Sequence, residues 1–332
     1  MALPLDVLAV VFAGAAPPAL AACARVSRAV GALAVDALYR DLRPTPRNVL
    51  RICLKLSADA ALARRVRSFA IRDDGVDMFL GLIADALPHL SRLATLVLDI
   101  GPSSAWILPA APPFRLRAFA CGFRFDAHVL AFLATQPALR SLSVAAAGPQ
   151  RPRIPRTLVP ALEVLCAPLA LVAALVPGRP VRAVTTTHTT PDAPPIAALA
   201  RSRAPAGVQH LMLNFRCLQA IAPALLAEAT PALRQLTVDA DGVKPDDDEM
   251  LDELTAWLEE YLSYARTLTC LTVRFFPALS RVPCQELDFS DMITSIFAAS
   301  PALLQVVVAF YAFKAKYVCR RQPGDDWYIV NE

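Results

Sequence analysis

The sequence repeats one short pattern four times, as VRSFAI at residues 66–71, LATLVL at 93–98, LRAFAC at 116–121 and LRSLSV at 139–144. Each hexapeptide has apolar residues at its first, fourth and sixth positions. The fourth and sixth positions alternate with the residues beside them, which is the pattern of a short β-strand with one buried face. The last three copies start 23 residues apart, at 93, 116 and 139, a period within the range of stacked structural repeats.

The same pattern continues beyond the first four copies. Further copies start at Leu162, Val181, Val208, Leu233, Leu268 and Leu303. Helix-like stretches lie between the copies, at 76–87, 127–136, 221–230, 246–266 and 290–300. A strand-helix unit of this size cannot bury its own apolar face, so the units should stack into a right-handed coil with an inner parallel sheet and outer helices. We therefore predict an α/β fold in which residues 46–332 form an irregular leucine-rich-repeat solenoid.

Alternating strands and helices are also typical of a doubly wound nucleotide-binding fold. That fold needs a glycine-rich turn after an early strand. Neither G-x-G-x-x-G nor G-x-x-x-x-G-K-[ST] occurs in the sequence. The repeat interpretation is therefore favoured.

The composition indicates a folded chain with a large buried surface. Hydrophobic residues make up 56% and charged residues only 19% of the 332 residues, which argues against disorder. The net charge of +4 is modest, and the arginines crowded between Arg40 and Arg72 are expected to form solvated faces. A nucleic-acid partner is not expected, because no basic face is interleaved with aromatic residues.

No chemistry-bearing motif predicts a catalytic or metal site. The 8 cysteines form no C-x-x-C pair and mostly lie in apolar runs, so we expect reduced, buried thiols in an intracellular protein. The histidines are scattered singly, at His89, His128, His188 and His210. The acidic run at 246–249 lacks calcium-loop spacing and is expected to begin a helix. We predict no catalytic residue, no metal and no cofactor.

Two apolar segments resemble membrane signals but do not fit them. The N-terminal segment lacks a basic start and carries Asp6, which argues against a signal peptide. Residues 158–176 contain Pro160 and Pro168, which argue against a membrane-spanning helix. We expect no membrane partner and a cytoplasmic or nuclear location.

The first 42 residues predict three short helices. Pro4 suits a first helical turn, after which Leu5, Leu8, Val11 and Phe12 mark one apolar face. A second helix is expected over 19–33, and a third carries Leu38, Tyr39 and Leu42. A module of this size has little core of its own, so it should dock on the repeats or on another protein.

This segment resembles an F-box. The resemblance is carried by Leu3-Pro4, Asp6-Val7-Leu8, Val11-Phe12, Cys23-Ala24-Arg25-Val26-Ser27-Arg28 and Leu38-Tyr39-Arg40-Asp41-Leu42. The whole chain is similar to the F-box proteins with repeats that are abundant in mushroom-forming fungi. The resemblance implies an F-box at 1–45 that binds the Skp-type adaptor of a cullin-RING (SCF-type) ubiquitin ligase, and repeats that hold a target protein.

Two sets of residues are candidates for these contacts. The adaptor-binding set comprises Leu3, Pro4, Val7, Leu8, Val11, Phe12, Leu20, Cys23, Val26, Val30, Leu38 and Tyr39. The target-binding set takes the solvent-facing positions of the inner strands: Thr95, Val97, Asp99, His210, Met212, Asn214, Gln235, Thr237, Asp239, Thr272 and Arg274.

Two other functions stay open. The helical segment can instead be only a cap on the first repeat of a non-catalytic scaffold, and an enzyme with an unrecognised site is a third hypothesis. Exposure of Leu8 and Phe12 would favour adaptor docking, whereas their burial under the first repeat would favour the cap.

Overall fold

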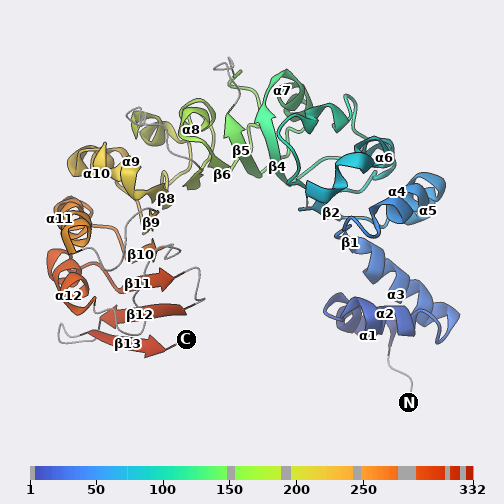
Figure 1. Ribbon diagram of the computed structural model, residues 1–332, viewed down its shortest axis with the longest axis horizontal. Coiled ribbons are helices and arrows are strands. Elements are labelled where there is room, and N and C mark those ends of the chain that lie inside the picture. Colours follow the sequence, from blue (N-terminus) through green and yellow to red (C-terminus); the bar gives the residue numbers. More distant parts are fainter. Residues whose placement is uncertain are drawn as a thin grey trace. The chain divides into compact units, whose positions relative to one another are not determined.

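The structure, a computed structural model, describes residues 4–72, 74–147, 154–187, 196–241, 248–275, 289–310, 315–321 and 327–331. The chain divides into two compact units, Met1–Pro152 (unit 1) and Arg153–Glu332 (unit 2). In each unit, strands form a sheet and the connecting helices lie on one side of it (Figure 1). The predicted boundary at residue 45 falls inside unit 1 and stays a prediction.

Unit 1 begins with three helices that share a small core. They are α1 (Leu5–Ala13), α2 (Pro17–Cys23) and α3 (Arg28–Arg40). Phe12, Leu20 and Ala34 are buried at their centre, and Val30, Leu33 and Leu38 are among the half-buried side chains packed around them.

The prediction of one helix over 19–33 is wrong, because non-helical residues separate α2 from α3. Ser27 has an extended backbone and its hydroxyl accepts a hydrogen bond from the Val30 N–H at 3.2 Å, so it caps a new helix. A Cβ at Gly31 would lie 2.7 Å from the Ala24 carbonyl oxygen. The two helices can therefore meet this closely only because residue 31 is glycine. The third predicted helix ends earlier than expected, since Leu42 belongs to a strand.

The sheet of unit 1 is parallel. Its strands follow chain order as β1 (Asp41–Leu42), β2 (Ser68–Ile71), β3 (Thr95–Leu98), β4 (Ala118–Phe125) and β5 (Ser141–Ala147). The connecting α-helices are α4 (Val49–Ala58), α5 (Ala60–Ala63), α6 (Leu80–Ala86) and α7 (Ala127–Ala134). Short 3-10 helices are η1 (Asp74–Phe79), η2 (Leu87–His89) and η3 (Ser104–Ile107).

Unit 2 continues the same alternation and then changes direction. Its parallel strands are β6 (Val164–Ala167), β7 (Ala183–Thr186), β8 (His210–Asn214), β9 (Gln235–Ala240), β10 (Cys270–Phe275) and β11 (Gln305–Phe310). Two antiparallel strands follow, β12 (Ala315–Arg321) and β13 (Trp327–Asn331). The helices are α8 (Leu169–Leu175), η4 (Ile196–Arg201), α9 (Phe215–Gln219), α10 (Pro223–Ala229), α11 (Asp248–Tyr264) and α12 (Ser290–Ala299).

The predicted apolar positions form the core in register. In unit 1, Phe69, Leu96 and Phe119 occupy matching positions of adjacent strands. In unit 2, Leu236 pairs with Leu271 in the same way. Every residue of the predicted apolar pattern is buried except Thr186, which is half-buried. This register confirms a leucine-rich-repeat-like solenoid pattern within each unit. The sequence pattern did not predict β1, α4, α5, α8, α9, β12 or β13.

A buried arginine, Arg179, lies shortly before β7. Arg179 is 1% exposed, and its guanidinium donates only to backbone carbonyl oxygens. The acceptors are those of Pro155, Leu158, Ala174, Leu175 and Pro177, at 2.8 to 3.3 Å. Burial lowers the pKa of this guanidinium below its ordinary value. Arg179 therefore holds together the turns on both sides of β6 and α8.

The cysteines of the described residues carry free thiols. Cys53, Cys121, Cys217 and Cys319 are buried, and Cys23, Cys166 and Cys270 are half-buried; Cys284 lies outside the described residues. Burial raises the pKa of Cys121 to about 12 and that of Cys53 and Cys319 to about 11. None of the helices in the described part of the chain has the length and apolarity to cross a membrane.

Candidate functional site

The first helix carries an apolar stripe that faces solvent. Val7, Val10 and Val11 are 41%, 76% and 57% exposed, and their spacing of three and four residues places them on one helix face. Phe12 is buried and Leu8 half-buried on another face. The three helices therefore bury one side of α1 and leave a second apolar side uncovered.

The predicted adaptor-binding residues divide between this surface and the core. Leu3 lies outside the described residues. The exposed members are Pro4, Val7, Val11 and Val26. The half-buried members are Leu8, Cys23, Val30, Leu38 and Tyr39. Phe12 and Leu20 are buried. Phe12 is covered by its own three helices and not by the first repeat, so neither of the two expected arrangements is found.

The helical module is joined to the repeats through α3. Strand β1 follows α3 directly and pairs with β2. Arg65 donates to the Ala32 carbonyl oxygen at 3.2 Å and lies 3.6 Å from the Asp36 carboxylate. The Lys55 ammonium lies 5.4 Å from the centre of the Tyr39 ring. These contacts attach α3 to the first repeat without covering Val7, Val10 or Val11.

The solvent-facing side of the unit 1 sheet carries mostly short, uncharged side chains. Thr95 and Val97 are half-buried and Asp99 is exposed. The matching positions of the neighbouring strands are Ser68, Ala70, Ala118, Ala120, Ser141 and Ser143. Short side chains of this kind provide little contact area for a partner.

The same side of the unit 2 sheet carries larger side chains that contact one another across strands. The Nδ1 atom of His210 lies 3.0 Å from Oε1 of Gln235. The Arg274 Nε lies 3.2 Å from Oδ1 of Asp239, and its Nη1 lies 3.0 Å from the Met212 sulfur. The predicted target-binding residues of unit 2 therefore come together on β8, β9 and β10.

The remaining predicted residues complete this surface. Asn214 and Asp239 occupy matching positions, as do Thr237 and Thr272. Asn214 also caps α9, since its Oδ1 accepts from the Arg216 N–H at 2.9 Å. The side chains of this surface are half-buried except that of His210, which is exposed.

Asp239 is the electrostatic centre of the surface. Burial raises the pKa of its carboxyl group above the ordinary value, and Arg274 lowers it while Asp241 raises it. The Asp239 and Arg274 side chains are only 17% and 18% exposed. This pair is therefore shielded from solvent more than an ordinary surface ion pair.

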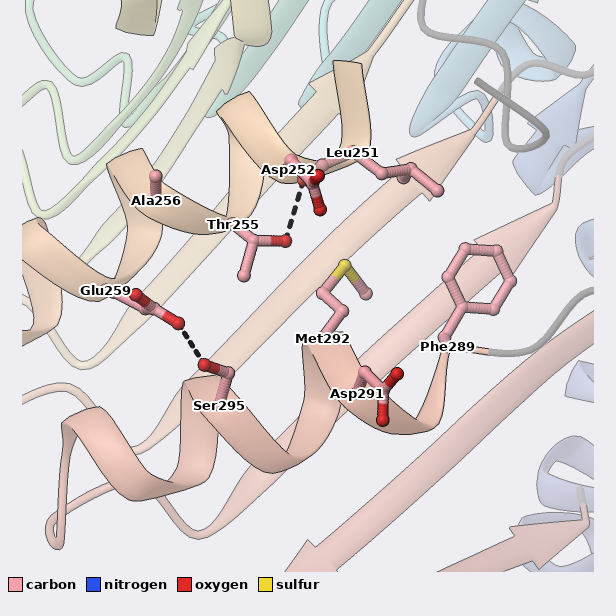
Figure 2. Close-up of a pocket in the computed structure, with 9 residues that line it drawn as sticks. All are labelled: Leu251, Asp252, Thr255, Ala256, Glu259, Phe289, Asp291, Met292 and Ser295. Carbon is pink, nitrogen blue, oxygen red and sulfur yellow. Dashed lines mark hydrogen bonds between the residues drawn. The ribbon is translucent and has the colours of Figure 1, made fainter. Parts of the chain in front are cut away.

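A hollow that the sequence did not predict lies between the outer helices α11 and α12. It has a volume of about 660 Å³ and is lined by acidic Asp252, Glu259 and Asp291 beside apolar Leu251, Phe289 and Met292. Figure 2 shows the Ser295 hydroxyl donating to the Glu259 carboxylate across it. In the sequence, Asp252, Ala256 and Glu259 are spaced by four and three residues, which places them on one helix face. This spacing is the feature of the sequence that could have indicated the hollow.

The described residues contain no group of three or more His, Cys, Asp or Glu side chains placed to hold a metal ion. The acidic run that was expected to begin a helix does so at Asp248, the first residue of α11; residues 246 and 247 lie outside the described part. The surfaces described above offer shape, apolar area and fixed hydrogen-bonding groups.

The comparisons with known proteins leave the family open. No protein-family model matches the chain, and no curated protein matches it. Among solved structures, the leucine-rich repeat-containing protein LegL7 from Legionella pneumophila is similar, with 13% sequence identity and a TM-score of 0.47 over 91% of this chain and 89% of that chain. The repeat architecture of the present chain rests on its own strand register and core.

Proposed function

We propose that this chain is the substrate-recognition subunit of an SCF-type ubiquitin ligase. Its N-terminal helices would bind a Skp-type adaptor, and its repeats would bind the target protein. The observation that supports this proposal most is the exposed stripe of Val7, Val10 and Val11 on a module that has its own core. Exposed apolar side chains at helical spacing are the usual anchors of helix packing between proteins.

The subunit would act by proximity and would need no catalytic residue. Binding of adaptor and target to one chain raises the effective concentration of the target near the ubiquitin-loaded enzyme. The inner face of unit 2 is the better target surface, because the side chains of Met212, Asp239 and Arg274 are already fixed against one another and lose little entropy on binding.

Co-purification of the full chain with the Skp-type adaptor tests this proposal. We expect the Val7→Asp/Val11→Asp variant to lose the adaptor, because both charges would enter an apolar contact. The matched control is Leu50→Asp/Leu54→Asp on α4, where both leucines are also exposed, at 46% and 52%. The control should retain the adaptor. Equal retention by both folded variants would refute docking through α1.

The alternative is a non-catalytic repeat scaffold whose helices only cap the first repeat. The pairing of β1 with β2 and the contacts of Arg65 with α3 favour it. On this alternative, the parent chain does not retain the adaptor, and Arg65→Ala lowers the stability of the helical module.

A further inference from the structure

A row of arginines runs along one edge of the unit 1 sheet, where the chain enters each strand. The first apolar position of each repeat is buried there, as for Val66, Leu93, Leu116 and Leu139. The residues on either side of these positions are largely arginines: Arg65, Arg67, Arg92, Arg115, Arg117 and Arg140. Arg65 is half-buried and the others are exposed. Together with the exposed Arg40 they are called the arginine edge.

Backbone hydrogen bonds align four of these arginines, Arg40, Arg67, Arg117 and Arg140, in a row in which Ala94 lies between Arg67 and Arg117. The Arg67 N–H donates to the Arg40 carbonyl at 2.8 Å, and the Ala94 N–H to the Arg67 carbonyl at 2.8 Å. The Arg117 N–H donates to the Ala94 carbonyl at 2.7 Å, and the Arg140 N–H to the Arg117 carbonyl at 2.9 Å. The row therefore advances by one strand spacing, about 4.8 Å, at each step. Arginines so close to one another raise the local positive potential.

Arg40 and Arg65 have acidic neighbours. Asp36 lies near Arg65, and Asp41 follows Arg40 in the chain. Arg115 donates to the Thr135 carbonyl at 2.6 Å, which positions the guanidinium without cancelling its charge. Within the described residues, Arg67, Arg92 and Arg117 form no ion pair.

Unit 2 has the same backbone arrangement without the same charge. The matching row is Glu163, Arg182, Gln209, Arg234, Thr269 and Leu304, joined by the same kind of hydrogen bond. Arg182 is paired with Glu163 at 3.0 Å. The concentration of arginine is therefore a property of unit 1 and not of the repeat itself.

We propose that the arginine edge binds an acidic, extended segment of a partner protein. A guanidinium matches a carboxylate with two parallel hydrogen bonds. The edge spans four strand spacings, roughly 19 Å, which is the length of about six residues of extended chain. The buried residues between the arginines are valine and leucines, so the edge offers no aromatic platform on which nucleic-acid bases could stack. This binding does not depend on the proposed ligase role.

Fluorescence anisotropy with the full chain tests the proposal. The probe is a labelled peptide of about ten residues that alternates Glu and Ser, beside a Gln-Ser peptide of the same length. We expect the chain to bind the Glu peptide, and Arg67→Gln/Arg92→Gln/Arg117→Gln to weaken binding at least about threefold, because three exposed ion pairs would be lost. The matched control is Arg203→Gln/Arg216→Gln/Arg266→Gln, which removes the same charge from exposed positions of unit 2. The control should weaken binding by less than about twofold.

Four results would overturn the proposal. The first is that the parent chain fails to bind the Glu peptide, and the second is that it binds the Gln peptide equally well. The third is equal weakening of binding in both triple variants, which would make net charge the cause. The fourth is that a single-stranded oligonucleotide binds the parent more tightly than the Glu peptide does and loses as much affinity in the first variant, which would identify a nucleic-acid surface.

Discussion

Units 1 and 2 share one core pattern but differ in where their arginines lie. Unit 1 gathers exposed arginines along the sheet edge, and its inner face carries mostly short, uncharged side chains. Unit 2 buries Arg179 among carbonyl oxygens and fixes Arg274 against Asp239 on its inner face. The comparison teaches that the apolar register specifies the repeat, while the positions between the apolar residues are free to specify different surfaces.

The largest effect is expected from Arg179, which has no counterpart among the exposed arginines of unit 1. Arg179→Met should lower the free energy of unfolding by about 4 kcal/mol, since it removes five hydrogen bonds donated by a charged group and each contributes about 1 kcal/mol or more. Arg179→Lys should recover little, because an ammonium cannot reach the same spread of acceptors. Urea denaturation measures both. A variant as stable as the parent would show that water replaces the guanidinium.

Substitution of leucines at equivalent core positions should destabilise the two units to a similar extent. Leu96→Ala in unit 1 and Leu236→Ala in unit 2 should each cost about 3 kcal/mol, because both side chains are fully buried. The measurement is again urea denaturation of the full chain. Losses in the free energy of unfolding that differ by more than about 2 kcal/mol would show that the two cores are not equivalent.

A glycine in β4 sets unit 1 apart. The register of β4 with β5 shifts between Cys121 and Arg124, and a Cβ at Gly122 would lie 2.6 Å from the Ile100 carbonyl oxygen. Gly122→Ala should therefore cost about 2 kcal/mol. Gly81→Ala in α6 is the control: nothing lies within 4 Å of its Cβ, and it should stabilise by about 0.5–1 kcal/mol. Thermal unfolding that ranks the two variants the other way would contradict the close approach.

The smallest effect concerns Asp239 on the inner face of unit 2. Its pKa is raised in the folded state, so folding favours the protonated carboxyl group. The contribution of this group to stability should fall as the pH rises from its ordinary pKa of 3.8 through the folded-state value. Asp239→Asn should therefore become more stable relative to the parent as the pH rises, in urea denaturation measured from about pH 4 to pH 7. An unchanged difference across that range would contradict the raised pKa.

The repeat was predictable from sequence because strand burial depends on local alternation. Leu96 and Leu236 lie in the core as their spacing indicates, and Asp99 and His210 are exposed as predicted. Helix boundaries near Ser27 were not predictable from apolar spacing, because a cap and the contact at Gly31 override it. The face of α1 that stays exposed was also not predictable, since it depends on how three helices pack.

Arg179 shows a second limit of the sequence. Its acceptors at Pro155 and Leu158 are more than twenty residues away, and nothing in the neighbouring sequence distinguishes it from an exposed arginine. The arginine edge is different, because the arginines flank the buried residue in Arg65-Val66-Arg67 and Arg115-Leu116-Arg117. Its alignment across repeats becomes visible only once the strands are in register.

The buried thiols can report how fast each unit opens. Only a thiolate reacts readily with alkylating agents, and the raised pKa values of Cys121 and Cys319 keep both groups protonated at neutral pH. Each thiol becomes reactive when its surroundings open. The rates at which iodoacetamide modifies Cys121 in unit 1 and Cys319 in unit 2, followed by mass spectrometry, would then time the opening of each unit without any engineered label.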